Sequence, residues 1–69
     1  MQRIEQQING RLYHIELSQL QRHRWRAHVV TAQGAPTALM PFYADTADAA
    51  AQRLAEWLTR LSRPSPAHA

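Results

Sequence analysis

The chain contains no cysteine and no lysine, and it has only two glycines. Because no disulfide can form, its 69 residues depend on one small apolar core, close to the lower limit for a stable domain. We therefore expect self-association to add stability, and the lack of cysteine favours a reducing, cytoplasmic location. No apolar run approaches the roughly 20 residues that cross a bilayer, so we expect no membrane contact.

Residue patterns typical of catalysis and metal binding are missing as well. The serine and threonine hydroxyls stand outside any nucleophile motif, and helix capping explains the carboxylates near residue 46. His23 and His28 are five residues apart, so on one strand they point to opposite faces, and no cysteine completes a ligand set with His14. The sequence predicts no enzyme, no metal site and no cofactor.

The most regular stretch, residues 46–61, predicts an amphipathic helix. Asp45 or Thr46 can cap its N-terminus, Asp48 complements the helix dipole in the first turn, and Pro64 prevents continuation. The apolar stripe, with spacings of three and four residues, consists of Ala50, Leu54, Trp57, Leu58 and Leu61. A lone helix of this length is marginal in water, so the stripe needs an apolar partner surface.

Ahead of the helix, Asn9-Gly10 predicts a two-residue type I′ turn between a strand of residues 3–8 and a strand of residues 11–17. Such a loop sets isoleucines opposite each other on one face, and opposite charges or a carboxylate and an imidazole on the other. The predicted pairs are Ile8 with Arg11, Gln6 with Tyr13, Ile4 with Ile15, Gln7 with Leu12, Glu5 with His14 and Arg3 with Glu16. The residues expected to face inward are Ile4, Tyr13, Ile15 and Leu17.

Two further strands are expected between the hairpin and the helix. Residues 18–23 are polar and predict a loop, after which residues 24–31 alternate again. A turn at residues 31–37 leads to a fourth strand at residues 38–43, which should be an edge strand or be broken at Pro41. The residues of the third strand that alternate inward are Trp25, Ala27 and Val29.

These elements together predict an α+β fold. It is an antiparallel meander of three or four strands with one C-terminal helix packed on one face, in the order β-β-β-β-α. Residues 1–62 form the single domain. Residues 63–69 contain proline and nothing able to build a core, so we expect a disordered tail.

The expected functional surface is the sheet edge around Pro41. Alternation cannot turn all of its apolar side chains inward, and an apolar edge beside a helix suits another chain, either a second copy or a partner's strand. We therefore expect a homo-oligomer or a small protein partner here, while the open alternative is that these side chains close the core. The residues of this edge are Leu39, Met40, Phe42 and Tyr43.

An alternative function is nucleic-acid binding through the sheet face opposite the helix. The basic residues on or beside its third strand are Arg22, Arg24, Arg26 and His28, in a chain of net charge +3. Arg3, Glu5 and Glu16 share that face and leave about one net positive charge on it, with no exposed aromatic side chain interleaved. The pattern favours a solvated face with cross-strand ion pairs over a nucleic-acid platform.

Three segments resemble a group of small uncharacterised bacterial proteins. They are W-R-A at residues 25–27, P-T-A-L-M-P-F-Y at residues 36–43 and D-T-x-x-x-A-A at residues 45–51. The resemblance covers most of the chain and implies no particular activity. The D-T-x-x-x-A helix start also resembles that of HicB-like antitoxin domains, which implies their βββα core, although Ala44 stands where those proteins usually have glycine.

Overall fold

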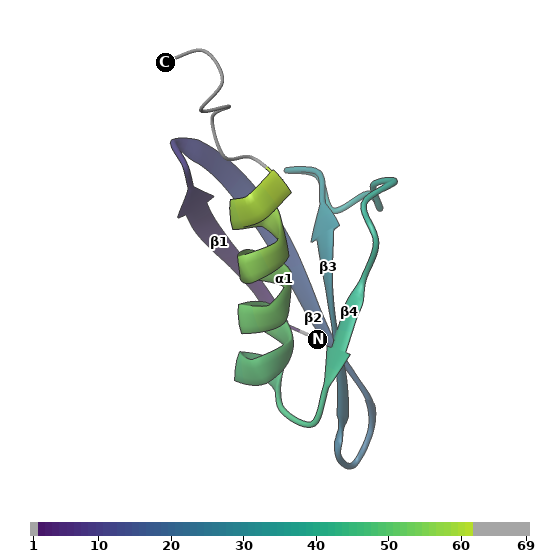
Figure 1. The fold of residues 1–69 in the computed structure, drawn as a ribbon. Helices are drawn as coiled ribbons and strands as arrows, with labels where there is room; N and C mark the ends of the chain where they lie inside the picture. The colour runs from purple at the N-terminus through teal and green to yellow at the C-terminus, as the bar shows by residue number, and fades with distance from the viewer. Residues whose placement is uncertain (1, 62–69) are drawn as a thin grey trace.

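The computed structural model describes residues 2–61 and begins with the predicted hairpin (Figure 1). Strand β1 (Gln2–Ile8) and strand β2 (Arg11–Gln21) are joined by Asn9 and Gly10, whose φ angles of 52° and 82° are those of a type I′ turn. Every cross-strand pair expected from this turn is observed, in unbroken register along β1. The hairpin prediction is confirmed.

β2 is longer than predicted, and the expectation of a loop at residues 18–23 is wrong. The ladder with strand β3 (Arg24–Val30) continues through this stretch with one register shift between Gln19 and Gln21, and the turn is confined to residues 22–23. Most of these polar side chains are exposed, so ladder pairing rather than burial keeps them in the strand.

The fourth strand is shorter and begins later than predicted. Strand β4 (Phe42–Ala44) pairs antiparallel with β3, whereas residues 38–41 lie outside any strand. Pro41 has no N–H to give to a ladder, so regular pairing begins only after it. The sheet order is β1-β2-β3-β4, which confirms the predicted antiparallel meander and the α+β class.

Helix α1 (Ala47–Leu61) follows β4 at once and begins within one residue of the predicted start. Thr46 is the N-cap, because its Oγ1 accepts a 3.1 Å hydrogen bond from the backbone N–H of Ala49. Asp48 lies in the first turn, as expected. Among residues 2–61 no helix is both long and apolar enough to cross a membrane. The tail predicted at residues 63–69 lies outside the described residues.

The apolar stripe of α1 packs on the sheet along most of its length. Leu54 and Leu58 have no exposed surface and share one core with Ile15 of β2. Trp57 packs at the margin of this core against Phe42, with ring centroids 5.5 Å apart. Leu61 is 57% exposed, so its inward assignment is wrong, because this last residue of α1 borders a hollow instead of packing in the core.

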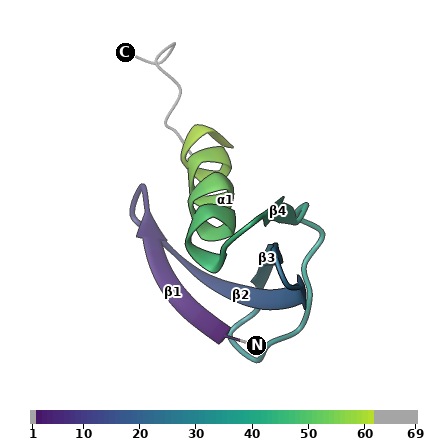
Figure 2. The same cartoon turned by 90° about the horizontal axis from the view of Figure 1, so that it is seen from below.

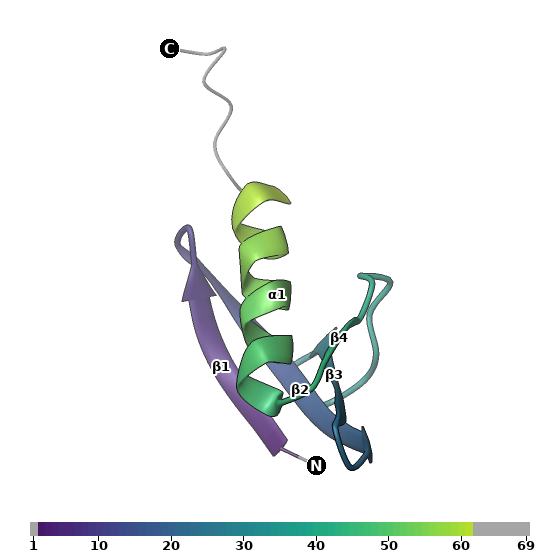
Figure 3. The ribbon, with the colours of Figure 1, turned by 60° about the horizontal axis from the view of Figure 1, so that its bottom comes forward.

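The helix lies along the concave side of the twisted sheet, and β1 and β4 form the two outer strands (Figures 2 and 3). We call the covered side the helix face and the opposite side the far face. Cross-strand pairs keep the alternation across the sheet, so Ala27 and Phe42 share the helix face while Arg26 and Tyr43 share the far face. The register set at the hairpin thus decides the face of the strand residues, except beyond the register shift between Gln19 and Gln21.

Replacing Leu54 by alanine removes a side chain without exposed surface and leaves a cavity in the core. We expect Leu54→Ala to lower the free energy of unfolding by about 2–5 kcal/mol, measured by urea denaturation followed by tryptophan fluorescence. The matched control is Leu61→Ala on the same helix, where a change within about 0.5 kcal/mol is expected. Equal losses for both leucines would contradict the packing described here.

Candidate functional site

The four apolar residues predicted at the Pro41 edge are divided between the core and the surface. Leu39 and Phe42 are half-buried and pack against the core. Met40 is 54% exposed and Tyr43 is 37% exposed. Two of the four side chains therefore close the core, and two remain available for contact.

β4 offers little backbone to an added strand. Along an antiparallel ladder, successive residues direct their backbone N–H and C=O alternately to one neighbouring strand and to the other. When this alternation is followed from the type I′ turn through the pairings of β2 and β3, the N–H and C=O of Tyr43 point away from β3, toward the open edge. That carbonyl already accepts a 3.0 Å hydrogen bond from Nη1 of Arg53 on α1. A strand added at β4 would have to displace this bond, so contacts at this edge depend on side chains.

Side chains hold the segment before Pro41 against β3. The hydroxyl of Thr37 donates a 2.8 Å hydrogen bond to the carbonyl of Val29, in the place of a ladder N–H, and accepts one of 3.3 Å from the N–H of Leu39. The carbonyl oxygen of Leu39 lies 3.0 Å from Nε2 of His28 on β3. Both backbone polar groups of Leu39 are thereby engaged, which fixes the segment that leads into Met40.

A hollow of about 420 Å³ opens on the helix face beside this segment and is lined by Asn9, Arg11, Tyr13, Leu39 and Leu61. Asn9 ties the hairpin turn to the last turn of α1, because its Nδ2 donates a 3.1 Å hydrogen bond to the carbonyl of Thr59. That carbonyl belongs to the group that a helix cannot satisfy internally at its C-terminus. We call this hollow the Leu39 hollow; the exposed Met40 follows Leu39 in the chain but does not line it.

The four residues predicted as a nucleic-acid face differ in their surroundings. Arg22 and Arg24 are exposed at the β2–β3 turn, whereas Arg26 and His28 are half-buried along β3. The guanidinium carbon of Arg24 lies 4.8 Å from the ring centroid of Tyr43. The expectation that no exposed aromatic residue joins this face is therefore wrong, because the register of β4 puts Tyr43 opposite Arg26.

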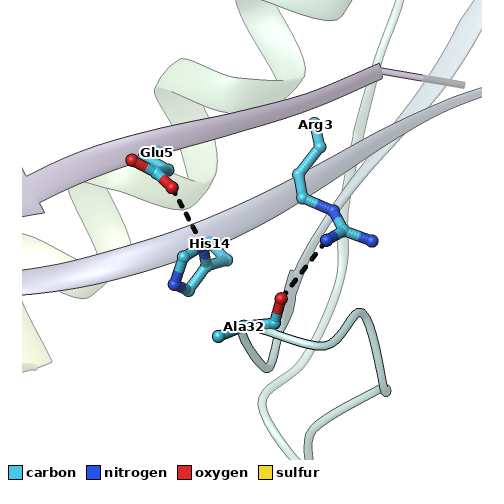
Figure 4. Close-up of polar contacts among 4 residues, drawn as sticks. All are labelled: Arg3, Glu5, His14 and Ala32. Carbon is cyan, nitrogen blue, oxygen red and sulfur yellow. Dashed lines mark hydrogen bonds and ion pairs between the residues drawn. The ribbon is translucent and has the colours of Figure 1, made fainter.

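Elsewhere the far face is partly occupied by the protein itself (Figure 4). Nδ1 of His14 lies 3.6 Å from a carboxylate oxygen of Glu5, the cross-strand contact that the register predicts. Nη1 of Arg3 donates a 3.5 Å hydrogen bond to the carbonyl of Ala32, so the loop after β3 reaches across this face toward β1. Val30 pairs with His14 on the far face and is nevertheless buried, which sequence alternation did not reveal.

No group of three or more histidine, cysteine, aspartate or glutamate side chains within residues 2–61 is arranged to hold a metal ion. Another hollow, of about 300 Å³, lies near the β2–β3 turn. Its lining includes His23, Arg24, Tyr43, Asp45 and Arg53, which are mainly polar. The described residues thus present two candidate surfaces, one at Leu39 that combines leucine side chains with Asn9 and Arg11, and one mainly polar at Arg24.

The hydroxyl of Thr37 has a role that can be tested by an isosteric change. Thr37→Val keeps the shape but leaves the carbonyl of Val29 and the N–H of Leu39 without this partner. We expect a loss of about 1–3 kcal/mol in unfolding free energy and faster amide exchange at Leu39. Thr37→Ser retains the hydroxyl and should lose much less; equal exchange in all three proteins would contradict the assignment.

Comparison with known proteins adds no assignment to this geometry. No family model matches the chain, and neither a curated protein nor a solved structure matches it. The two resemblances drawn from short motifs therefore stay predictions.

Proposed function

We propose that the protein is a small non-enzymatic interaction module that binds another protein at the Leu39 hollow. The observation that carries this proposal is the pair of leucines, Leu39 and Leu61, that line one hollow beside Tyr13. Leu61 is 57% exposed and lines it with Leu39, and Met40, 54% exposed, follows directly in the chain. Methionine is enriched at protein contacts, and a partner that fills the hollow would bury the exposed leucine at its rim.

The frame around the hollow favours the same function. The hydrogen bonds of Thr37 and Asn9 hold its two sides before any partner arrives, which lowers the cost of ordering on binding. Arg11 supplies a cation among the apolar lining residues. A partner that inserts an apolar side chain next to a carboxylate fits this chemistry. Within the proposal the module acts in the bacterial cytoplasm, consistent with its cysteine-free sequence and motif resemblance.

The test compares three immobilised baits in lysate of the native host, followed by titration of the recovered partner. Wild type should retain one defined protein, and Met40→Gln/Leu61→Gln should weaken its binding at least about tenfold, because the apolar contact is lost. Leu20→Gln is the matched control, since it removes a leucine of 44% exposure at the other end of β2. Failure of wild type to retain a protein, or equal retention by all three baits, would overturn the proposal.

The stacking of Arg24 on Tyr43 supports nucleic-acid binding as a second candidate. Arg22 and Arg24 are exposed beside an exposed aromatic ring, and His23 and Arg53 border the adjoining hollow. A guanidinium next to a ring suits a phosphate followed by an unstacked base. The far face also carries Glu5 and Glu16, so this candidate ranks below protein binding.

Fluorescence anisotropy with a labelled single-stranded oligonucleotide tests this candidate. Affinity should fall steeply with salt, and Arg24→Ser should reduce the slope of log K against log salt by about 1. Arg60→Ser on the helix removes the same charge away from Tyr43 and is the matched control. Equal effects of the two substitutions, or no binding at low salt, would reject a specific basic site.

A further inference from the structure

β1 is a long outer strand, and among the helix and strands of residues 2–61 only β2 and α1 contact it. It spans seven residues without proline, and its ladder with β2 has no register shift. Figures 1 and 3 show it at the edge of the sheet opposite β4, and the helix packs mainly on β3 and β4. Proteins usually protect such an edge with proline, a bulge or a covering segment, because it is a template for pairing with another strand.

The hairpin turn determines which backbone groups this edge presents. The residues that flank a two-residue turn exchange hydrogen bonds with each other, and such pairs then alternate along the ladder. Ile8 and the other even-numbered residues of β1 therefore direct their backbone groups to β2, whereas Arg3, Glu5 and Gln7 direct theirs outward. The same alternation turns the carbonyl of Val29 away from β2, where Thr37 is observed to bind it.

We propose that β1 pairs antiparallel with β1 of a second copy of this chain, about a two-fold axis that passes Ile4. Across this edge, hydrogen bonds can form only where an outward-directed residue of one copy lies opposite an outward-directed residue of the other. This condition holds when the two-fold axis passes through a residue, and an axis near the middle of β1 then passes residue 3, 4 or 5. An axis at Arg3 sets that residue against itself, and an axis at Glu5 does the same with carboxylates. Only the axis at Ile4 sets Arg3 opposite Glu5 of the second copy, twice.

This register continues the charge pattern of the far face across the seam. Within one copy, Arg3 lies opposite Glu16, and Glu5 lies opposite His14 at 3.6 Å. Each row of far-face side chains that runs across the strands and over the axis then contains, in order, Glu16, Arg3, Glu5 of the second copy and His14 of the second copy. Acidic and basic side chains alternate along both symmetry-related rows, which favours this register over its neighbours.

The helix face agrees with the same register. Ile4, half-buried at the margin of the core, meets Ile4 of the second copy and loses its remaining contact with water. A groove of about 390 Å³ between β1 and α1 is lined by Gln6 and by helix residues that include Asp48, Ala51 and Glu56. The helix packs mainly on β3 and β4, away from the open side of β1. The two helices lie on one side of a continuous sheet, on either side of the axis.

Single-cysteine crosslinking reads the register directly, because the chain has no cysteine of its own. The Cα atoms of Ile4 and its symmetry mate form a pair without mutual hydrogen bonds, at about 4.5 Å, within the roughly 4.4–6.8 Å of disulfides. Ile4→Cys should give a disulfide-linked dimer with oxidised glutathione. Gln6→Cys, on the same face, has its symmetry mate about 13 Å away along the strand and should not.

Charge reversal tests the same pairing without a covalent bond. Arg3→Glu and Glu5→Arg each set like charges across the axis, so each variant alone should be monomeric in analytical ultracentrifugation at concentrations where wild type is dimeric. An equimolar mixture of the two variants restores opposite charges and should form a heterodimer. Circular dichroism of each variant confirms that β1 and the rest of the fold are retained.

A wild-type protein that stays monomeric at about 1 mM, where even a millimolar complex would be substantially formed, overturns the proposal. Crosslinking through Gln6→Cys as readily as through Ile4→Cys overturns the register, and so does a mixture that fails to associate. None of the substituted residues lines the Leu39 hollow. Arg3→Glu also removes the hydrogen bond from Arg3 to Ala32, whereas Ile4→Cys and Glu5→Arg retain it, so failure of these two variants is distinguishable from failure of the proposed function.

Discussion

The type I′ turn at Asn9 and Gly10 sets the constraint on which the rest of the structure depends. Its two positive φ angles force a two-residue loop, and that loop fixes the pairing of β1 with β2. Strand alternation then carries the choice of face through β3 to β4. The same choice decides which side chains reach the helix, which charges meet on the far face and which backbone groups remain at the open edge.

Sequence reasoning succeeded where structure depends on neighbours along the chain. The hairpin register, the start of α1 and the burial of Leu54 and Leu58 follow from turn chemistry, capping and periodicity. It failed where contacts between residues far apart in the chain determine the local structure or burial. The hydroxyl of Thr37 takes the place of a ladder N–H at the carbonyl of Val29, and Leu61 borders a hollow at the end of α1 and is exposed.

The candidate site was predictable only in part, for the same reason. An excess of apolar residues around Pro41 was visible in the sequence, but which of them reach the surface depends on the register of a three-residue strand. That register also brings Tyr43 to Arg24, a contact between residues that belong to different predicted surfaces. A pattern of alternation assigns faces within a strand, whereas it does not locate the partner strand.

The hydrogen bond from Asn9 to Thr59 joins residues 50 positions apart, and its consequence concerns the order of folding. Closing a two-residue turn costs little chain entropy, whereas bringing the end of α1 onto that turn closes almost the whole described chain. We therefore expect the hairpin to form early and the last turn of the helix to dock late. Asn9, which forms the hairpin turn at the start of folding, would then also bind the last turn of α1 at the end.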